Sequence, residues 1–269
     1  MKWLFLLLIP LVLWCMLLRC GRYHPIWKTL KQFRYAHRGL HDKPTIPENS
    51  MAAFRRAVDH GFGAELDVHL MKDGNLAVIH DSSLLRTAGR DIRIEELTKE
   101  DLQQYLLEES TETIPLLKDV LNLFEGKAPL IIELKPEGGN QNELSAAVAA
   151  MLDAYKGDYC IESFDPRVVR WFRTHRPEVC RGQLSCDFVH DEKSKLPKYL
   201  KFILTNLLYN NSNQPDFVAY RFADRKNLSL RLCKFLWKPV IVHWTIKTPA
   251  DLQTAETEGA VCIFEQFIP

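Results

Sequence analysis

Five short segments of the chain carry more charged and titratable side chains than strand ends normally hold. They are Ala36-His37-Arg38-Gly39, Glu65-Leu66-Asp67, His80-Asp81, Glu133-Leu134-Lys135 and Ser163-Phe164. Histidine titrates near neutral pH, which suits it to proton transfer, whereas buried acids and lysines are seldom tolerated without a partner or a metal ion. Taken alone, each segment indicates a turn or an ion pair. Their shared position in the predicted fold is what points to one catalytic site.

Each of these segments comes at the carboxy-terminal end of a predicted strand. We expect strands at residues 33–37, 64–70, 76–80, 130–134, 159–164, 179–184, 217–220, 240–244 and 260–264, and helices at 50–60, 116–124, 142–154, 166–175 and 249–258. Alternation of strands and helices over about 240 residues predicts an α/β protein with a (β/α)8 (TIM) barrel. The carboxy-terminal ends of the barrel strands are where such folds hold their active sites.

Nine strands are one too many for this barrel, and the strand at 76–80 is the surplus one. Lys72-Asp73-Gly74-Asn75 leaves no room for a crossover helix, whereas Asp73-Gly74 is a strong signal for a two-residue hairpin loop. That loop would put Asp67 opposite His80, and Glu65 on the same face as Asp67. We therefore expect a short β-hairpin and a small insertion after the second strand.

Composition places the chain among ordinary globular proteins. It has 269 residues, of which 46% are hydrophobic and 26% are charged, enough to bury a full core. The formal net charge is +1, so no overall basic field draws the protein to nucleic acid. The seven cysteines show no metal-ligand spacing, and we interpret those of the barrel as buried apolar residues.

The first residues form an uncharged apolar run from 3 to 18, interrupted by Pro10. We interpret residues 1–20 as an N-terminal hydrophobic helix that serves as an uncleaved membrane anchor, 21–32 as a basic juxtamembrane linker and 33–269 as the barrel. Basic residues crowd the carboxy-terminal side of the run, and the cysteines are odd in number and scattered. Both features favour a single-pass protein of the cell membrane with a cytoplasmic barrel, although an outward-facing barrel stays open.

The order of the motifs resembles the glycerophosphodiester phosphodiesterase family, whose members have a phospholipase-C-like TIM barrel. The matching pieces are His37-Arg38-Gly39, Pro47-Glu48-Asn49-Ser50, Glu65-x-Asp67, Asp73-Gly74, His80-Asp81, Ile114-Pro115-x-Leu117, Glu133-x-Lys135, Ser163-Phe164 and Trp244-Thr245. Each piece is weak evidence alone, but all of them run in the family's order over effectively the whole barrel. The resemblance implies hydrolysis of glycerophosphodiesters to glycerol 3-phosphate and an alcohol.

The resemblance also assigns roles to single residues. It implies a divalent cation, Ca²⁺ or Mg²⁺, at Glu65, Asp67 and Glu133, and three carboxylates suit such a hard ion. His37 and His80 match the general acid/base pair, and Arg38 and Lys135 match positions that bind phosphate. Phe164 and Trp244 either line the substrate mouth or pack in the core. The nucleophile, a neighbouring glycerol hydroxyl or water, stays open.

Two features of the sequence bear on the substrate. The family commonly has Thr-Asp where this chain has Glu265-Gln266, a departure that concerns substrate fit more than reaction type. Lysines at 193–201 precede an apolar run at 202–209, which predicts either a barrel helix with a solvated lysine face or a surface that meets membrane lipid. The alternative functions are accordingly a membrane-associated lysophospholipase D and, less favoured, a catalytically silent membrane-tethered binding module. The oligomeric state stays open.

Overall fold

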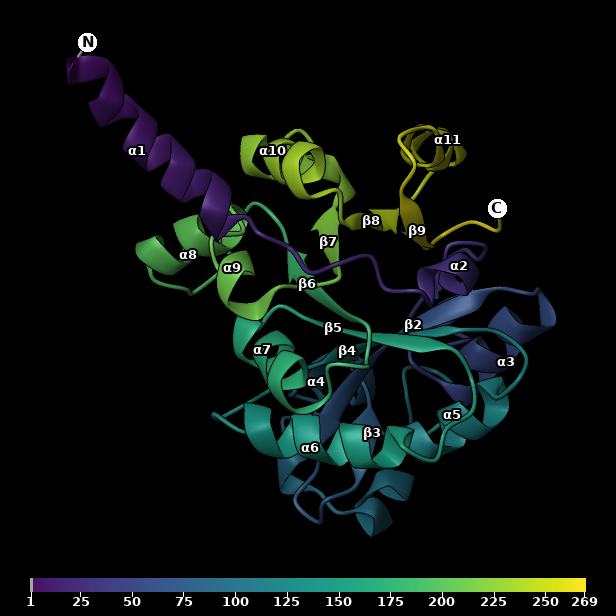
Figure 1. Cartoon of the computed structure of the whole chain (residues 1–269). Coiled ribbons are helices and arrows are strands. Elements are labelled where there is room, and N and C mark those ends of the chain that lie inside the picture. Colours follow the sequence, from purple (N-terminus) through teal and green to yellow (C-terminus); the bar gives the residue numbers. More distant parts are fainter. Residues whose placement is uncertain (1) are drawn as a thin grey trace.

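Eight parallel strands close into a barrel within residues 2–269, the part of the chain that the computed structural model describes (Figure 1). The strands are β1 (Tyr35–His37), β2 (Gly63–Leu70), β4 (Leu130–Leu134), β5 (Tyr159–Ser163), β6 (Arg181–Ser185), β7 (Phe217–Arg221), β8 (Val240–Ile246) and β9 (Val261–Phe264). β1 pairs in parallel with both β2 and β9, which closes the barrel. The predicted TIM barrel is confirmed.

Helices cover the outside of the barrel. They are α3 (Met51–Asp59), α5 (Leu117–Phe124), α6 (Gln141–Leu152), α7 (Pro166–His175), α8 (Lys198–Thr205), α9 (Asn210–Asn213), α10 (Leu228–Trp237) and α11 (Pro249–Thr257). The Ser50 hydroxyl caps α3 by accepting a hydrogen bond from the Ala53 amide, and α7 and α11 begin with proline after a capping Asp165 and Thr248. Local capping signals thus fix where several of these helices begin.

The hairpin exists, but its register differs by one residue from the prediction. β3 (Leu76–Val78) runs antiparallel to β2 with Val68 opposite Val78, and the Met71 amide bonds to the Asn75 carbonyl at 2.9 Å. The loop therefore has three residues, Lys72-Asp73-Gly74, with Gly74 at a φ of +85°. This extra loop residue places Ile79, rather than His80, against Asp67. His80 follows the strand as it leaves the sheet.

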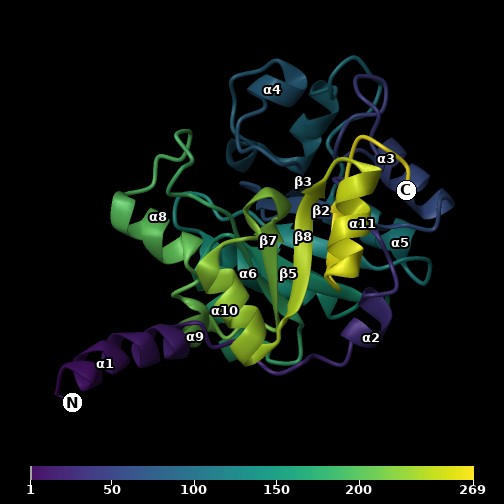
Figure 2. The same ribbon diagram turned by 90° about the horizontal axis from the view of Figure 1, so that it is seen from above.

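The predicted small insertion follows β3 and has an apolar core of its own. It contains α4 (Leu85–Ala88) and the short 3-10 helices η1 (Ile94–Glu96) and η2 (Lys99–Gln104). Ile79, Leu84, Ile94, Leu102 and Leu107 are buried together in it. Figure 2 shows α4 and its loops beyond β3, at one end of the barrel. Packing of these side chains holds the insertion beside the strand ends.

The barrel interior changes from apolar to polar along the strands. Alternate residues of each strand face inward, and Tyr35, Ile131, Cys160 and Ile263 belong to one buried apolar cluster. Two positions further along the same faces come His37, Glu133, Glu162 and Glu265. A two-residue step therefore carries each strand from the packed core to the polar end.

Helix α1 (Lys2–Leu17) projects from the body of the molecule in Figures 1 and 2. Its length contradicts the prediction of a single-pass membrane protein. Its 16 residues span about 24 Å, less than the roughly 30 Å of a bilayer core. Within residues 2–269, no helix combines the length and the apolar character needed to cross a membrane. The predicted localisation as a single-pass protein of the cell membrane is therefore wrong.

The apolar run at residues 3–18 does not continue into a longer helix, because its last residues pack on the barrel. Leu18 is fully buried with Val218 and Leu230, and the Trp14 indole donates a hydrogen bond to the Ser229 hydroxyl at 3.2 Å. Beyond it, α2 (Trp27–Leu30) inserts Trp27 against Phe217, with ring centroids 5.0 Å apart. The domain boundaries given above, at residues 1–20 and 21–32, stay predictions.

Candidate active site

Three carboxylates meet at the polar end of β2 and β4. Asp67 and Glu133 are paired residues of these strands, and Glu65 lies two positions before Asp67 on the same face. One oxygen of each lies within 4.8 Å of the others, and the three side chains are buried. Burial raises the pKa of Glu65, and repulsion by Asp67 and Glu133 raises it further. Buried, mutually repelling oxygens fit a hard divalent cation, so this cluster could hold one.

Two basic side chains lie against the same acids. The Lys135 ammonium is 2.7 Å from Glu133 and 3.1 Å from Asp67, and the Arg38 Nε is 3.4 Å from Asp67. Burial alone would raise the pKa of Asp67, but Lys135, His80 and Arg38 outweigh it and hold that pKa well below its usual value. The Asn49 amide adds a hydrogen bond to Asp67 at 2.9 Å. Asn49 thus helps to hold Asp67 in place at the site.

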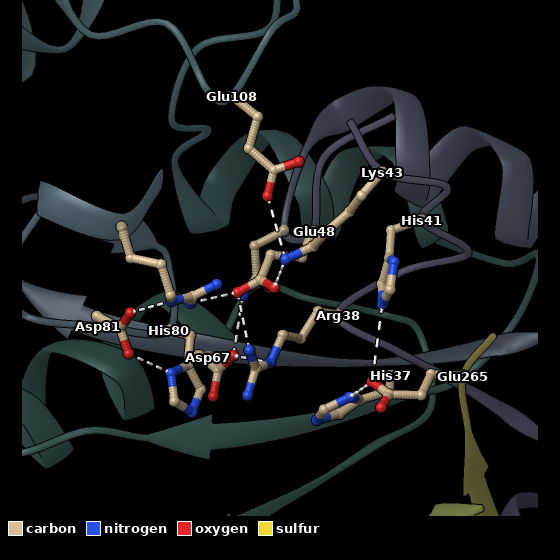
Figure 3. A network of polar contacts seen from close by, with 12 residues as sticks. His37, Arg38, His41, Lys43, Glu48, Asp67, His80, Asp81, Glu108 and Glu265 are labelled. Atoms are coloured by element: carbon tan, nitrogen blue, oxygen red, sulfur yellow. Dashed lines mark hydrogen bonds and ion pairs between the residues drawn. The ribbon is translucent and has the colours of Figure 1, made fainter. Parts of the chain in front are cut away.

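The two predicted catalytic histidines stand on either side of this cluster, with Arg38 and Asp67 between their rings in the view of Figure 3. His80 Nδ1 is 2.6 Å from an Asp81 oxygen, and His37 Nδ1 is 2.7 Å from Glu265 Oε2. An ionised carboxylate only accepts, so Nδ1 of each ring carries a proton, and a ring in its neutral form has its lone pair on Nε2. Burial lowers the pKa of His37, which favours this neutral form.

The turn after β1 requires the glycine of His37-Arg38-Gly39. Gly39 has a φ of +79°, and a Cβ built there would lie 2.8 Å from the Ala53 side chain. This close approach packs the start of α3 against the turn. The Arg38 amide can then donate to Glu65 at 3.1 Å, which ties the turn to the acid cluster.

Phe164 and Trp244 are neighbours at the rim of the acid cluster. Their ring centroids lie 5.5 Å apart, and the Lys135 ammonium lies 5.8 Å from the Phe164 centroid. A cavity of about 360 Å³ is lined by His80, Glu133, Lys135 and Phe164. The sequence-predicted site residues are therefore gathered at one end of the barrel.

Comparison with known proteins identifies the family to which this chain belongs. The model of the glycerophosphoryl diester phosphodiesterase family matches residues 37–268, nearly the whole barrel. The chain belongs to this family. It is accordingly a phosphodiesterase that hydrolyses glycerophosphodiesters.

Individual relatives agree with the family. A glycerophosphodiester phosphodiesterase of Bacillus altitudinis is 35% identical over 248 residues, which cover 87% of this chain and 94% of that protein. A lysophospholipase D of Rattus norvegicus is 35% identical over 125 residues, 42% of this chain and 38% of that protein. A phosphodiesterase structure from Oleispira antarctica, in complex with sn-glycerol-3-phosphate, shares the fold with a TM-score of 0.73 at 22% identity, covering 89% of this chain and 94% of that one.

In this family member, Glu48 gathers three basic side chains above the site (Figure 3). Arg38 donates to it at 2.8 Å and Arg86 at 2.6 Å, and Lys43 forms a further ion pair. Arg86 comes from α4 of the insertion, and its Nε also bonds to Asp81 at 2.5 Å. A continuous set of ion pairs therefore connects Arg38 to the partner of His80.

Replacement Glu48→Gln is expected to destabilise the fold by about 3 kcal/mol at pH 7, because it leaves three cations without their shared buried anion. Burial alone would raise the pKa of Glu48, but Arg86, Arg38 and Lys43 hold it far below its usual range. A depressed carboxyl pKa stabilises the fold above about pH 4.3, and this contribution is lost as the pH falls further. Urea unfolding of wild type and variant between pH 3 and pH 7 measures it.

The wild-type advantage should therefore shrink with acidification. Glu143→Gln, on the exposed face of α6, is the matched control and should change little. A Glu48→Gln deficit that stayed constant down to pH 3 would contradict the assigned ionisation.

Several residues of the site belong to no motif in the sequence, and Glu265 was expected to concern substrate fit more than reaction type. Glu162, in β5 beside Glu133, is 1% exposed, and burial together with the Glu133 charge raises its pKa. Glu265 and His41 meet beside His37, and Arg86 reaches the site from the insertion. The two-residue period from Cys160 to Glu162 and from Ile263 to Glu265 was a signal that could have found the two acids. No local sequence pattern predicts that Arg86 or His41 belongs to the site.

Proposed function

We propose that this phosphodiesterase releases glycerol 3-phosphate and an alcohol from glycerophosphodiesters by acid/base catalysis with His37 and His80. The observation that carries the proposal is the pair of imidazoles around one buried acid cluster. Each ring has its Nδ1 hydrogen-bonded to a carboxylate, at 2.7 Å for His37 and 2.6 Å for His80. Each therefore keeps Nε2 for the substrate.

Glu65, Asp67 and Glu133 are the residues that would hold the divalent cation, Ca²⁺ or Mg²⁺. Their carboxylates are buried, crowded within 4.8 Å, and offer only hard oxygen donors. When bound, the cation would stabilise negative charge on the non-bridging oxygens of the phosphate. Burial and the charges of Asp67 and Glu133 raise the pKa of Glu65, and a bound cation would favour its ionised form.

Arg38 and Lys135 are proposed to bind the same phosphate oxygens. The guanidinium offers a planar fork of donors, and the ammonium a point charge that remains protonated, because Asp67 and Glu133 raise its pKa against the effect of burial. Both groups already lie within 3.4 Å of Asp67. Phe164 and Trp244 are proposed to contact the glycerol side of the substrate at the rim.

The proton steps then fall to the two rings. One Nε2 takes the proton from the attacking oxygen, a neighbouring glycerol hydroxyl or water, as that oxygen bonds to phosphorus. Attack by water gives glycerol 3-phosphate directly, whereas attack by the hydroxyl gives a cyclic phosphate that water must then open. The other ring, protonated on both nitrogens, gives its Nε2 proton to the oxygen of the departing alcohol as the bond between that oxygen and phosphorus breaks. Burial keeps His37 neutral, which favours it as the base and His80 as the acid.

A lysophospholipid is the second candidate substrate, and a specific observation supports it. A second cavity of about 530 Å³ shares Phe164 and Asp165 with the one beside His80. Its lining includes Phe188, Leu196, Leu200 and Leu204, so an apolar chain attached to the phosphodiester could extend into it. The similarity to a lysophospholipase D over 125 residues agrees with this alternative.

One assay tests both substrates. The purified protein with Mg²⁺ or Ca²⁺ is given glycerophosphocholine or lysophosphatidylcholine below its micellar concentration, and products are identified by ³¹P NMR. We expect glycerol 3-phosphate from the first substrate, since one phosphate oxygen stays on glycerol. Release of phosphocholine instead, or no turnover, would contradict the proposal.

A substitution in the apolar cavity tests whether the chain of lysophosphatidylcholine binds there. If lysophosphatidylcholine is also cleaved, Leu200→Glu should lower its kcat/KM by about 10-fold or more, because the new charge would be desolvated beside the chain. The same variant should leave glycerophosphocholine hydrolysis unchanged. Activity on the soluble diester alone would reject the lipid alternative.

A further inference from the structure

Glu265 begins the segment that follows β9, beside the site and on the far side of the barrel closure from β2. Its Oε2 is 2.7 Å from His37 Nδ1, and its Oε1 is 2.8 Å from the Lys247 ammonium. The Glu265 amide bonds to the Ile246 carbonyl at 3.0 Å, which fixes the backbone next to β8. The carboxylate is mostly buried and held from both ends.

This contact leaves the His37 ring one useful orientation. The carboxylate accepts the Nδ1 proton, so the lone pair is on Nε2, which lies 3.9 Å from a Glu65 oxygen and thus faces the acid cluster. His80 Nδ1 likewise lies 2.6 Å from an Asp81 oxygen. The two histidines therefore each have a carboxylate behind the reactive nitrogen.

We propose that Glu265 is a positioning residue that fixes the tautomer and orientation of His37 for proton transfer. The inference rests on the proposed role of His37 and deepens it. Burial alone would raise the pKa of Glu265, but the hydrogen bonds from His37 and His41 and the Lys247 ammonium hold that pKa far below its usual range. His41 Nε2 lies 3.8 Å from Oε2, the oxygen that also bonds to His37 (Figure 3).

A metal ion is the alternative occupant of this position. One ligand atom each from His37, His41 and Glu265 lies within 4.8 Å of the others. A cation there would occupy a nitrogen of His37. The Lys247 ammonium already neutralises the carboxylate, and His37 already satisfies it by a hydrogen bond. The charge balance of the cluster therefore favours positioning over metal binding.

The kinetic test compares Glu265→Gln with Glu265→Asp. The amide can donate as well as accept, so it no longer enforces the Nδ1-H tautomer; the equivalent change in a serine protease triad costs about 10⁴ in kcat. We expect Glu265→Gln to lower kcat for glycerophosphocholine by about 10²-fold with KM within about 3-fold. Glu265→Asp should recover most of the loss. Glu256→Gln, which breaks only an exposed ion pair with Arg34, is the matched control and should match wild type.

A spectroscopic readout separates this inference from the proposed function. In ¹⁵N-histidine NMR spectra assigned with a His37→Gln variant, wild type should show a protonated Nδ1, and Glu265→Gln a mixture of tautomers. An inactive wild type would defeat the proposed function while the spectrum still decides the tautomer. An unchanged tautomer, a loss expressed only in KM, or Zn²⁺ binding that His41→Gln abolishes would overturn the positioning role.

Discussion

Replacement of His37 or His80 by alanine is expected to lower kcat for glycerophosphocholine by about 10³-fold, with the folded structure intact. Each ring stands beside the buried acid cluster with only one nitrogen committed to a carboxylate. Alanine removes the proton carrier but neither a core side chain nor a member of the Glu48 ion-pair set. Steady-state kinetics with thermal unfolding of each variant measures the two effects separately.

The control is a histidine outside the site. His60 follows the last residue of α3 on the surface, and its ring bonds to the Arg56 carbonyl, so His60→Ala should match wild type. Because acid and base act in one reaction, the double variant should lose little more than either single one. Activity of His37→Ala within a few-fold of wild type would reject the mechanism.

An activated substrate distinguishes the two roles. A p-nitrophenyl phosphodiester has a leaving group that departs without a proton, so it relieves the need for the acid but not for the base. The variant that lacks the acid should therefore recover on this substrate. If His37 is the base, recovery should be seen in His80→Ala and not in His37→Ala. The reverse result would exchange the assignments.

Removal of divalent metal is expected to abolish activity, and Mg²⁺ or Ca²⁺ should restore it. Glu65, Asp67 and Glu133 crowd their oxygens within 4.8 Å in a buried position, and a cation relieves that repulsion. Metal at 100 times its Kd should add about 2.7 kcal/mol of stability. Chelator titration followed by activity and thermal unfolding measures both. Full activity in chelator would reject metal dependence.

The variant Glu65→Gln tests whether this carboxylate is one of the groups that hold the metal ion. The variant should lose both activity and the metal-dependent rise in unfolding temperature. In chelator it should be at least as stable as wild type at neutral pH, because it removes one of the repelling charges. A raised carboxyl pKa lowers stability progressively as the pH rises above the unfolded-state value, so this advantage should vanish in acid. Glu137→Gln, at an exposed ion pair with Arg93, is the control.

Local sequence determined much of the fold and the positions of the site residues that lie on one strand. The two-residue period in Glu65-Leu66-Asp67 places both acids on the inner face of a strand, and the strand–helix alternation closes that strand into a barrel. The Asp73-Gly74 pair determined that a hairpin follows. Its register depended on whether the loop has two or three residues, a difference of one left-handed residue that a dipeptide signal does not resolve.

The tertiary structure decided what lies far apart in the chain. Glu265 reaches His37 across the closure between β9 and β1, and Arg86 reaches Glu48 from the insertion. The apolar first residues predicted a helix, and only packing of Leu18 beside α10 showed where that run ends. Periodicity and capping act over a few residues, and so can be identified from sequence. Contacts between distant segments depend on how the whole barrel closes.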